Sequence, residues 1–206
     1  TFSLESLNSG GNSPSCTLIP PERVLQIAKR LACPLLVDEA YADFADGNCL
    51  RLLAESDTIM VSRSLSKSYA LAGLRFGVLV ARPSLIAHLN KVKDSYNCDR
   101  LSIAGAVAAI HDQVWLAENR AKILATRDWT TRQLRELGFA VVESQANFVW
   151  CQYPTRAAFE LYTQLKDRHR ILVRHMDYPG GGDGLRISIG TDDQMQACAD
   201  TLRALL

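Results

Sequence analysis

The feature that most constrains the fold is an apolar run, Pro34–Val37, that ends abruptly in two acids, Asp38 and Glu39. A continuous apolar run of this length, bounded by turn signals, is typical of a strand buried in a parallel sheet. In an open α/β sheet, ligand-binding groups gather where the parallel strands end. The run therefore predicts an α/β fold with a polar site directly after Val37.

A second apolar run, Thr58–Val61, is followed by a loop that is rich in hydroxyl and cationic groups. Three alternating serines lead up to Lys67, and Arg75 follows in the same loop. Such a loop can bind a phosphate dianion while it presents an amine to a carbonyl group, which is the core requirement of pyridoxal phosphate chemistry. The alternative is a polar loop with a solvated lysine.

The acids after the first run fit the same chemistry. Asp38 would pair with the protonated pyridine nitrogen, which keeps the ring an electron sink, and Tyr41 would donate a hydrogen bond to the phenolic oxygen. Acids are also favoured at a helix N-terminus, which is the alternative interpretation of Asp38 and Glu39. The presence of Lys67 one strand further along favours the ligand site.

Four motifs follow one another in an order that resembles a known family: Val37–Tyr41, Ser64–Lys67, Leu71–Gly77 and Leu185–Thr191. The chain resembles the fold-type I pyridoxal phosphate aminotransferases of class I and II, most closely the histidinol-phosphate aminotransferase branch. The segments Ile171–Arg174 and Gln145–Val149 resemble that branch more than the aspartate aminotransferases. The resemblance implies an α/β fold: the remainder of a mostly parallel large-domain sheet plus a small α+β C-terminal domain.

The resemblance also implies pyridoxal 5′-phosphate as cofactor and a role for each matching residue. Lys67 would be the Schiff-base lysine and would carry the proton between the substrate Cα and C4′ of the cofactor. Asp38 and Tyr41 would contact the ring as described above, and Asn12 would also contact its phenolic oxygen. The cofactor phosphate would be bound by Ser64, Ser66 and Arg75.

The substrates implied by the resemblance are a phosphorylated amino alcohol and a 2-oxo acid or glutamate. Arg174 and Arg186 would bind their anionic ends, because a guanidinium fork suits both phosphate and carboxylate. Tyr96 and Asn97 resemble a pair that lies near the substrate and the dimer contact. The alternatives are ordinary surface ion pairing for the two arginines and a helix-capping role for Asn97.

The implied reaction is transamination of histidinol phosphate with 2-oxoglutarate or glutamate in histidine biosynthesis, by a homodimer. Two alternatives stay open. One is a threonine-phosphate decarboxylase-like enzyme, which shares the Asp, Tyr, Lys and Arg set. The other is a catalytically incomplete fragment, because a large part of the family pattern precedes the turn at Asn12. We therefore expect the chain to correspond to a C-terminal portion.

The beginning of the chain departs from the family pattern. Cys16 stands where the family has a glycine, and a cysteine would strain the turn if that position needs a positive φ. Residues 1–11 are atypical, and residues 1–9 match nothing in the pattern, so we assign no element to 1–9. The rest divides into the remaining part of the cofactor-binding large domain (1–100), a long helical connection (101–137) and a small C-terminal domain (138–206).

Local patterns predict the elements within these regions. In the first region we expect strands near 34–38, 58–62 and 76–81 and helices near 20–32 and 83–93. One long helical stretch is expected over 102–137, ended by Gly138. The last region should contain strands 139–143, 147–151, 171–174 and 185–189 and helices 155–168 and 192–205.

Composition excludes several kinds of partner. The 206 residues carry a net charge of +1, which gives no reason to expect nucleic acid or membrane binding. No apolar run approaches the roughly 20 residues that cross a membrane. The six cysteines are scattered without a C-x-x-C pair, which argues against a zinc site and favours reduced thiols in a cytoplasmic protein.

Overall fold

The computed structural model describes residues 5–8 and 13–206, and the chain divides into two compact units. The first unit comprises Thr1–Asn12 and Leu18–Glu118, and the second comprises Ser13–Thr17 and Asn119–Leu206. The boundary between Glu118 and Asn119 falls within one helix, α4 (Gln113–Glu136).

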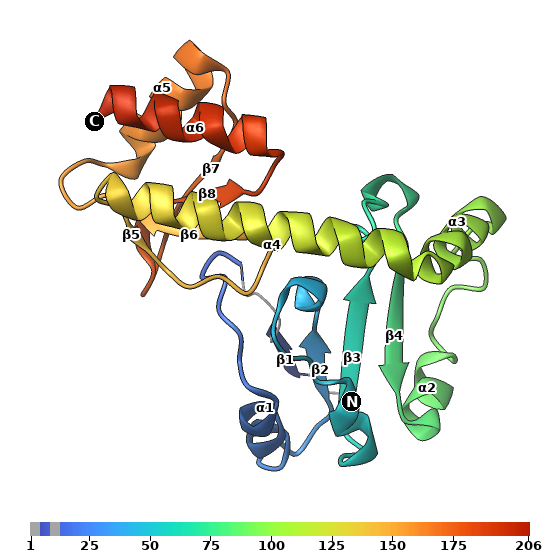
Figure 1. The fold of residues 1–206 in the computed structure, drawn as a ribbon. Helices are drawn as coiled ribbons and strands as arrows, with labels where there is room; N and C mark the ends of the chain where they lie inside the picture. The colour runs from blue at the N-terminus through green and yellow to red at the C-terminus, as the bar shows by residue number, and fades with distance from the viewer. Residues whose placement is uncertain (1–4, 9–12) are drawn as a thin grey trace. The chain divides into compact units, whose positions relative to one another are not determined.

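The first unit contains a four-stranded sheet (Figure 1). Its strands lie in the order β1 (Glu5–Asn8), β2 (Leu35–Asp38), β3 (Ile59–Ser64) and β4 (Gly77–Ala81). The pairs β1–β2 and β2–β3 are parallel, and β3–β4 is antiparallel. This confirms the α/β fold with a mostly parallel sheet, to which an antiparallel edge strand is added.

Strand β1 is an element that the sequence analysis did not assign. Glu5–Asn8 pairs in parallel with Leu35–Asp38, residue by residue. Only Leu7 is a large apolar residue in this strand, so its sequence has no alternation that would have predicted it. The pairing with β2 forms the strand here, rather than a local preference.

The first unit is completed by short helical segments. They are α1 (Pro21–Ala28), the 3₁₀ helices η1 (Ala42–Phe44), η2 (Leu50–Ala54) and η3 (Ala72–Leu74), α2 (Pro83–Leu89) and α3 (Arg100–His111). Helix α1 begins with proline in its first turn, as expected, and ends earlier than expected. Val24 and Ala28, one turn apart on α1, pack against apolar residues of β2 and β3 in one buried cluster.

The expected helical stretch over 102–137 consists of two helices, α3 and α4. The chain breaks at Asp112 (φ −88°, ψ 68°), and the Asp112 side chain accepts a hydrogen bond from the amide of Trp115 (3.1 Å) at the start of α4. An aspartate that caps a helix in this way ends one helix and begins the next. Gly138, with φ +91°, follows α4 and ends it as predicted.

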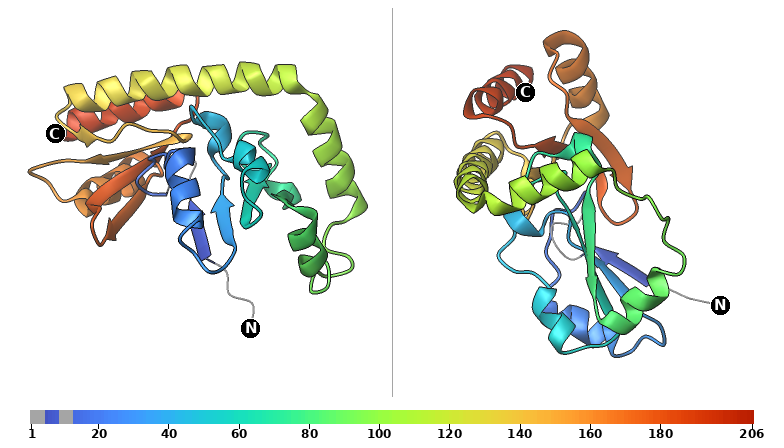
Figure 2. Two further views of the ribbon diagram at one scale, coloured as in Figure 1. Left: turned by 90° about the horizontal axis from the view of Figure 1, so that it is seen from below. Right: turned by 90° about the vertical axis from the view of Figure 1, so that its right-hand side faces the viewer.

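The second unit is a small α+β layer (Figure 2). Its antiparallel sheet has the order β5 (Ala140–Val141), β6 (Phe148–Gln152), β8 (Gly182–Ser188) and β7 (Arg174–Tyr178). Helices α5 (Ala158–His169) and α6 (Asp192–Leu205) pack against each other, and α5 contacts β7 and β8. Thr191 and Gln194 form a reciprocal capping box at the start of α6.

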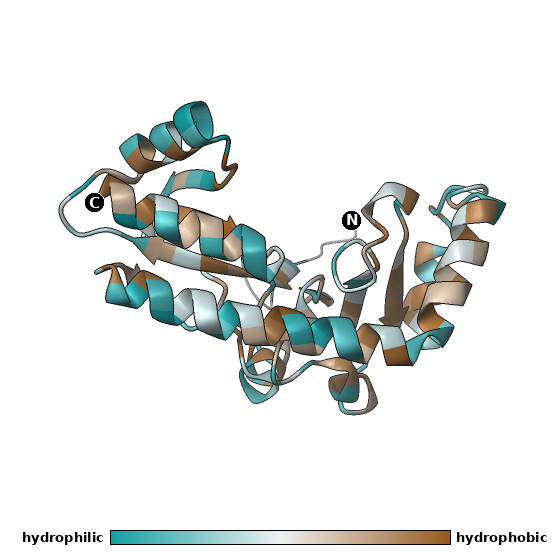
Figure 3. Ribbon diagram, turned by 45° about the horizontal axis from the view of Figure 1, so that its top comes forward, coloured by the Kyte–Doolittle hydropathy of each residue, from teal (hydrophilic) through white to brown (hydrophobic). Residues whose placement is uncertain are grey.

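One face of this sheet forms the core of the second unit. Val149 is paired with Ile187, and Cys151 with Leu185, so these four side chains point to the same face. They belong to a buried cluster that also contains residues from the end of α4, from α5 and from α6. In Figure 3, brown apolar residues recur along these strands, and both apolar and polar residues occur along the helices of this unit.

The strand expected over 171–174 begins only at Arg174, so that boundary was wrong. Arg170 has a positive φ (+58°) at the end of α5, and the amide of Ile171 donates to the Leu165 carbonyl (2.9 Å). These bonds end α5 in the way a Schellman motif does and delay the start of the strand. Gly180 and Gly182, both with positive φ, form the turn that joins β7 to β8.

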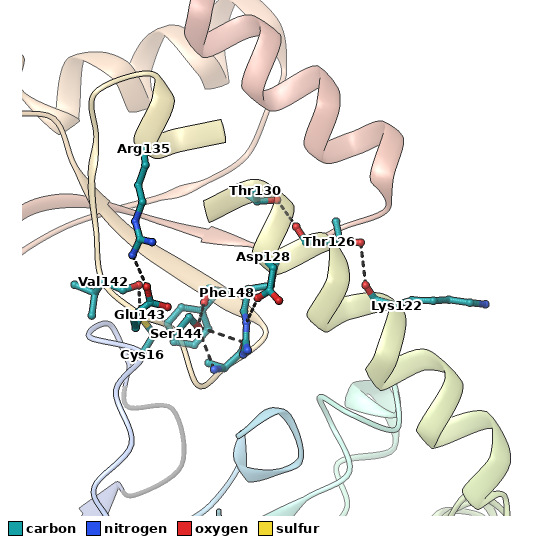
Figure 4. Close-up of polar contacts among 12 residues, drawn as sticks. Cys16, Lys122, Thr126, Asp128, Thr130, Arg135, Val142, Glu143, Ser144 and Phe148 are labelled. Carbon is teal, nitrogen blue, oxygen red and sulfur yellow. Dashed lines mark hydrogen bonds and ion pairs between the residues drawn. The ribbon is translucent and has the colours of Figure 1, made fainter. Parts of the chain in front are cut away.

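The segment Ser13–Thr17 packs within the second unit (Figure 4). The Cys16 carbonyl accepts a hydrogen bond from the amide of Gln145 (2.8 Å), and the Cys16 thiol lies 4.0 Å from the Val142 carbonyl oxygen. Cys16 has φ +55°, so this position does require the conformation that favours glycine. Burial raises the pKa of the Cys16 thiol above its ordinary value.

All six cysteines are free thiols, and four of them are buried. Within residues 5–8 and 13–206, no helix is long and apolar enough to span a bilayer. The same residues contain no group of three or more His, Cys, Asp or Glu side chains placed to hold a metal ion.

Candidate active site

Asp38 ends β2 beside the parallel strand β3, where the sequence predicted a ligand site. Its Oδ1 accepts a hydrogen bond from the amide of Ala40 (3.0 Å) and lies 3.4 Å from the Ser62 hydroxyl, which donates to it. Asp38 and Ser62 are direct partners across the two strands. These contacts hold a half-buried carboxylate at the carboxyl end of the sheet.

Lys67 lies in the loop that follows β3, and the structure brings it to Tyr41. The Lys67 Nζ is 5.6 Å from the centroid of the Tyr41 ring, which is within cation–π range. Local hydrogen bonds shape the loop: the amide of Ser66 donates to the Ser64 hydroxyl (3.1 Å), and the amide of Ala70 donates to the Lys67 carbonyl (3.2 Å). The amine itself is exposed.

Two residues of this loop adopt a conformation that L-residues rarely take. Ala70 has φ +54° and Arg75 has φ +51°, and neither is glycine. Such positions cost about 1–3 kcal/mol each and cluster at ligand sites, where the surrounding structure holds them. The exposed Arg75 guanidinium donates to the Ala72 carbonyl (3.0 Å). Ser64, Ser66 and Arg75 thus lie on one short, locally constrained loop with Lys67.

Helix α3 packs closely on the far end of this loop. The Ser102 hydroxyl donates to the Leu74 carbonyl (3.1 Å), and a Cβ on Gly105 would lie 2.7 Å from Leu74 Cδ1. A larger residue in place of Gly105 would therefore require the Leu74 side chain to shift. Asp99 caps α3, and hydrogen bonds from Ser102 hold the pKa of the Asp99 carboxyl below its ordinary value.

Tyr96 and Asn97 precede α3. Tyr96 is 93 % exposed, and the Asn97 side chain accepts a hydrogen bond from Lys93 Nζ (3.0 Å). Because Asp99 caps the helix, the alternative that Asn97 is its cap was wrong. The substrate role of the pair stays a prediction.

Arg174 and Arg186 are partners across β7 and β8, so the structure brings these two predicted residues together. Alternation along β8 places them on the face opposite to Leu185 and Ile187, away from the core of the second unit. The Arg186 guanidinium lies over the Phe148 ring (4.6 Å from Cζ to the centroid).

One nitrogen of the Arg186 guanidinium is left without an acceptor. Its Nη1 donates to the Ser13 hydroxyl (2.9 Å), while its buried Nε has no hydrogen-bond partner among the residues that the structure describes. A buried guanidinium nitrogen without an acceptor is costly unless a ligand supplies one. Ser13 follows Asn12, which lies outside the described residues.

Sequence reasoning missed a set of polar residues behind the Lys67 loop. Arg63 forms ion pairs with both Glu39 (2.8 Å) and Asp43 (2.9 Å), and Ser68 donates a hydrogen bond to Asp43. Glu39 was interpreted only together with Asp38. An arginine directly before the serine motif was the signal that could have identified its partner, since a buried acid requires one.

The residues of the first unit fit pyridoxal phosphate. Lys67 would supply an amine for its aldehyde, Asp38 a carboxylate for its pyridinium nitrogen and Tyr41 a phenol for its phenolic oxygen. Two hydroxyls and a guanidinium from Ser64, Ser66 and Arg75 suit a phosphate dianion. The donor set is therefore complementary to the cofactor, group by group.

In this chain, a loop that carries a lysine follows one strand of the sheet, and an acid ends the parallel strand next to it. The same chain continues into a small α+β unit. This combination defines the class of fold-type I pyridoxal phosphate enzymes. The sequence model for aminotransferase class I and II matches residues 9–202. The chain belongs to that family, which confirms the resemblance inferred from its motifs.

Two relatives and two solved structures refine this comparison. The chain is 56% identical over 187 residues to the histidinol-phosphate aminotransferase of Rhodopirellula baltica, covering 91% of this chain and 51% of that protein. It is 45% identical over 194 residues to that of Geobacter sulfurreducens, covering 94% and 55%. The chain thus spans about half the length of the curated relatives it matches.

The histidinol-phosphate aminotransferase of Sinorhizobium meliloti, solved in complex with pyridoxal-5′-phosphate, has a TM-score of 0.89 at 28% identity, covering 98% of this chain and 58% of that one. The L-threonine-O-3-phosphate decarboxylase of Porphyromonas gingivalis has a TM-score of 0.82 at 20% identity, covering 98% and 64%. The latter similarity shows the fold alone. The family and the former structure support pyridoxal phosphate as the family's cofactor.

Proposed function

We propose that this chain supplies the reactive lysine of a pyridoxal phosphate-dependent aminotransferase. The reaction would transfer an amino group between histidinol phosphate and 2-oxoglutarate or glutamate, as a step of histidine biosynthesis. The observation that carries this proposal is the position of Lys67, over the Tyr41 ring and one strand from Asp38. The relatives' names supply the substrate, and the Lys67 site supplies the chemistry.

Each predicted site residue of the first unit has a part in this reaction. Bound pyridoxal phosphate supplies an electron sink for the electron pair left when the substrate Cα loses its proton. Lys67 attaches the cofactor through Nζ and, once released, takes the proton from Cα and delivers it to C4′. Asp38 holds the proton on the pyridine nitrogen, and Tyr41 donates a hydrogen bond to the phenolic oxygen. Ser64, Ser66 and Arg75 bind the phosphate.

The second unit would bind the anionic ends of the substrates. The buried Nε of Arg186 has no hydrogen-bond partner in the described part of the chain, and the guanidinium contacts Phe148 and Ser13. Arg174 faces the same side of the hairpin. Two guanidinium groups can bind the phosphate of histidinol phosphate in one half-reaction and a carboxylate of glutamate in the other.

A spectroscopic experiment tests the site. Pyridoxal phosphate is added to the purified chain, the absorbance spectrum is recorded, borohydride is added, and the reduced adduct is located by peptide mapping. We expect the adduct on Lys67 and its loss in Lys67→Ala, but not in the exposed control Lys29→Ala. A folded chain with no adduct on Lys67 would contradict assembly of the site by this chain and favour a catalytically incomplete fragment.

A second candidate is decarboxylation, because a threonine-phosphate decarboxylase shares the fold. Product analysis separates the two reactions. Transamination of histidinol phosphate yields a keto product and consumes 2-oxoglutarate, whereas decarboxylation of a phosphorylated amino acid releases carbon dioxide. The identity of the relatives favours transamination.

We also propose that the enzyme is a homodimer. Apolar side chains on one helix support this: Leu101, Ile103, Val107 and Ile110 of α3 are all exposed in the single chain. Large exposed apolar patches on soluble proteins commonly mark interaction surfaces. Light scattering with size exclusion would give the assembly state. The cytoplasmic location expected from the cysteine pattern stays a prediction.

A further inference from the structure

A continuous set of polar contacts connects the segment around Tyr41 to the loop that carries Lys67. Arg63 Nε donates to Glu39 Oε2 (2.9 Å), and Arg63 Nη1 donates to Asp43 Oδ1 (2.9 Å). On its other oxygen, Asp43 accepts a hydrogen bond from the Ser68 hydroxyl. Glu39 also accepts a hydrogen bond from the backbone amide of Cys49. We call Glu39, Arg63, Asp43 and Ser68 the polar bridge.

The two ends of the polar bridge lie next to the predicted reactive groups in the sequence. Arg63 points to the face of β3 opposite to Ser62 and Ser64, since side chains alternate along a strand. At one end of the bridge, Asp43 is two residues from Tyr41. At the other end, Ser68 is the residue after Lys67. The bridge therefore fixes the two segments whose separation sets the contact between Lys67 Nζ and the Tyr41 ring.

The side chains of the bridge are largely buried, which restricts their positions. The side chain of Glu39 is fully buried, and those of Arg63 and Asp43 are 18% and 27% exposed. A guanidinium that donates to two carboxylates has a fixed fork geometry. A buried ion pair adds little net stability compared with apolar packing, so stability alone is a weak reason for such a bridge. It does restrict where its members lie, and reacting groups need that restriction.

We propose that Asp43, held by Arg63 and acting through Ser68, is a positioning residue for Lys67. This inference rests on the proposed function, because it assigns to the bridge the task of presenting the Lys67 amine to a phosphorylated aldehyde. Without the bond between Ser68 and Asp43, the exposed amine would stay reactive. The loop would lose the arrangement in which Ser64, Ser66 and Arg75 bind the phosphate while Lys67 meets the aldehyde.

Four variants test the bridge. Asp43→Ala removes the contacts with Arg63 and Ser68, and Ser68→Ala removes only the contact between Ser68 and Asp43, which keeps the test usable if the first variant does not fold. Asp43→Asn keeps an oxygen for Arg63 and an amide N–H that can donate to the Ser68 hydroxyl. This variant should therefore retain the position of the Lys67 loop. Asp57→Ala is the matched control, because it breaks an exposed ion pair with Arg82 in the same unit.

The first measurement is made on the chain without cofactor. Hydrogen exchange of the segment 64–71 should be faster in Asp43→Ala and Ser68→Ala, on the order of tenfold, because the loop amides lose their support. Asp43→Asn and Asp57→Ala should resemble the unmodified chain. Unchanged exchange in both bridge variants would overturn the inference, whether or not the chain binds a cofactor.

The second measurement separates positioning from stability. Pyridoxal phosphate and pyridoxal, which lacks the phosphate, are each trapped on Lys67 with borohydride, and the ratio of the two rates is compared. The bridge variants should lose the preference for the phosphorylated aldehyde by on the order of tenfold, with the rate for pyridoxal unchanged. A retained preference in folded bridge variants would overturn the inference. An unmodified chain that shows no preference would instead contradict the proposed function, and the exchange measurement would still decide the role of the bridge in the loop.

Discussion

The interactions that stabilise each unit internally differ between the two units. In the second unit, four consecutive residues of β6, Phe148–Cys151, are buried, and the sheet and three helices share one apolar cluster. In the first unit, the edge strand β4 is largely exposed, with Val80 at 39%. The first unit has its own buried apolar cluster of α1, β2 and β3, and the polar bridge connects the residues that follow β2 to β3 and to the loop after it.

This difference separates stability from chemistry. An apolar core stabilises a unit without specifying where any polar group lies, and the second unit carries Arg174 and Arg186 on a hairpin, on the sheet face opposite to that core. Hydrogen bonds and ion pairs specify directions, and the first unit has them around the amine, the carboxylate and the loop that we predict to bind the cofactor phosphate. Its two left-handed residues, Ala70 and Arg75, lie in that same loop.

The largest effect that would sharpen the comparison is the loss of the reactive amine. Lys67→Ala should abolish cofactor capture and lower turnover of the assembled enzyme by at least about 10²–10⁴-fold, the usual contribution of one positioned acid–base group. Lys166→Ala, which removes an exposed lysine of the second unit, should change neither. Capture is followed by absorbance and borohydride trapping. Substantial turnover in Lys67→Ala would sink the assignment of the first unit as the reactive one.

The next effect compares the stability of the second unit's core with that of the first unit's β4 edge. Leu161→Ala removes a fully buried side chain of α5 and should lower the free energy of unfolding of the second unit by about 2–5 kcal/mol. Val80→Ala on the exposed edge of the first unit should cost about 1 kcal/mol or less. Hydrogen exchange read segment by segment assigns each loss to a unit. Equal losses would contradict the claim that the β4 edge of the first unit contributes less apolar stabilisation than the core of the second.

Raising the pH into the alkaline range should destabilise the second unit through its buried thiols. Burial raises the pKa of Cys198 to about 11 from an ordinary value of 9.0, and it raises the pKa of the fully buried Cys151 as well. A thiol whose pKa is higher in the folded state stabilises that state below pH 9 and loses this contribution as the pH rises toward 11. The expected loss from Cys198 is about 2–3 kcal/mol.

Urea unfolding at pH 8 and pH 11 under reducing conditions would measure this loss. Cys198→Ala should be less stable than the unmodified chain at pH 8, because a buried thiol is lost, and the gap should narrow at pH 11. Fluorescence of Trp129 and Trp150, both in the second unit, would report the transition. A gap that stays constant with pH would contradict the assignment of this loss to Cys198.

The sequence predicted the strand ends well because chemistry interrupts the apolar pattern there. Asp38 and Lys67 follow apolar runs, and the structure places both at the expected edge. It did not predict β1, whose residues have no alternation and gain their strand from pairing. The break at Asp112 was missed because the residues on both sides favour a helix, and a single side-chain cap decides it.

The polar bridge could not be predicted from local patterns. Glu39 and Arg63 are far apart in the sequence and meet only because β2 and β3 are adjacent and in a particular register. Sequence reasoning identifies residues that act through their type and position in a motif. Residues that act by holding others, as we propose for Asp43 and Ser68, are recognised only when the tertiary contacts are known.

The smallest effect tests whether backbone strain is tied to function in one unit only. Arg170 and Ala70 both have positive φ, the first at the end of α5 and the second beside Lys67. Glycine adopts this conformation without the Cβ clash, so Arg170→Gly and Ala70→Gly should each raise the free energy of unfolding by about 0.5–1 kcal/mol, reduced in part by the greater freedom of glycine in the unfolded chain. Only Ala70→Gly should slow the capture of pyridoxal phosphate, because it loosens the Lys67 loop, whereas Arg170→Gly should leave capture unchanged. Equal capture by both variants would show that the strained loop of the first unit is no more functional than a helix end of the second.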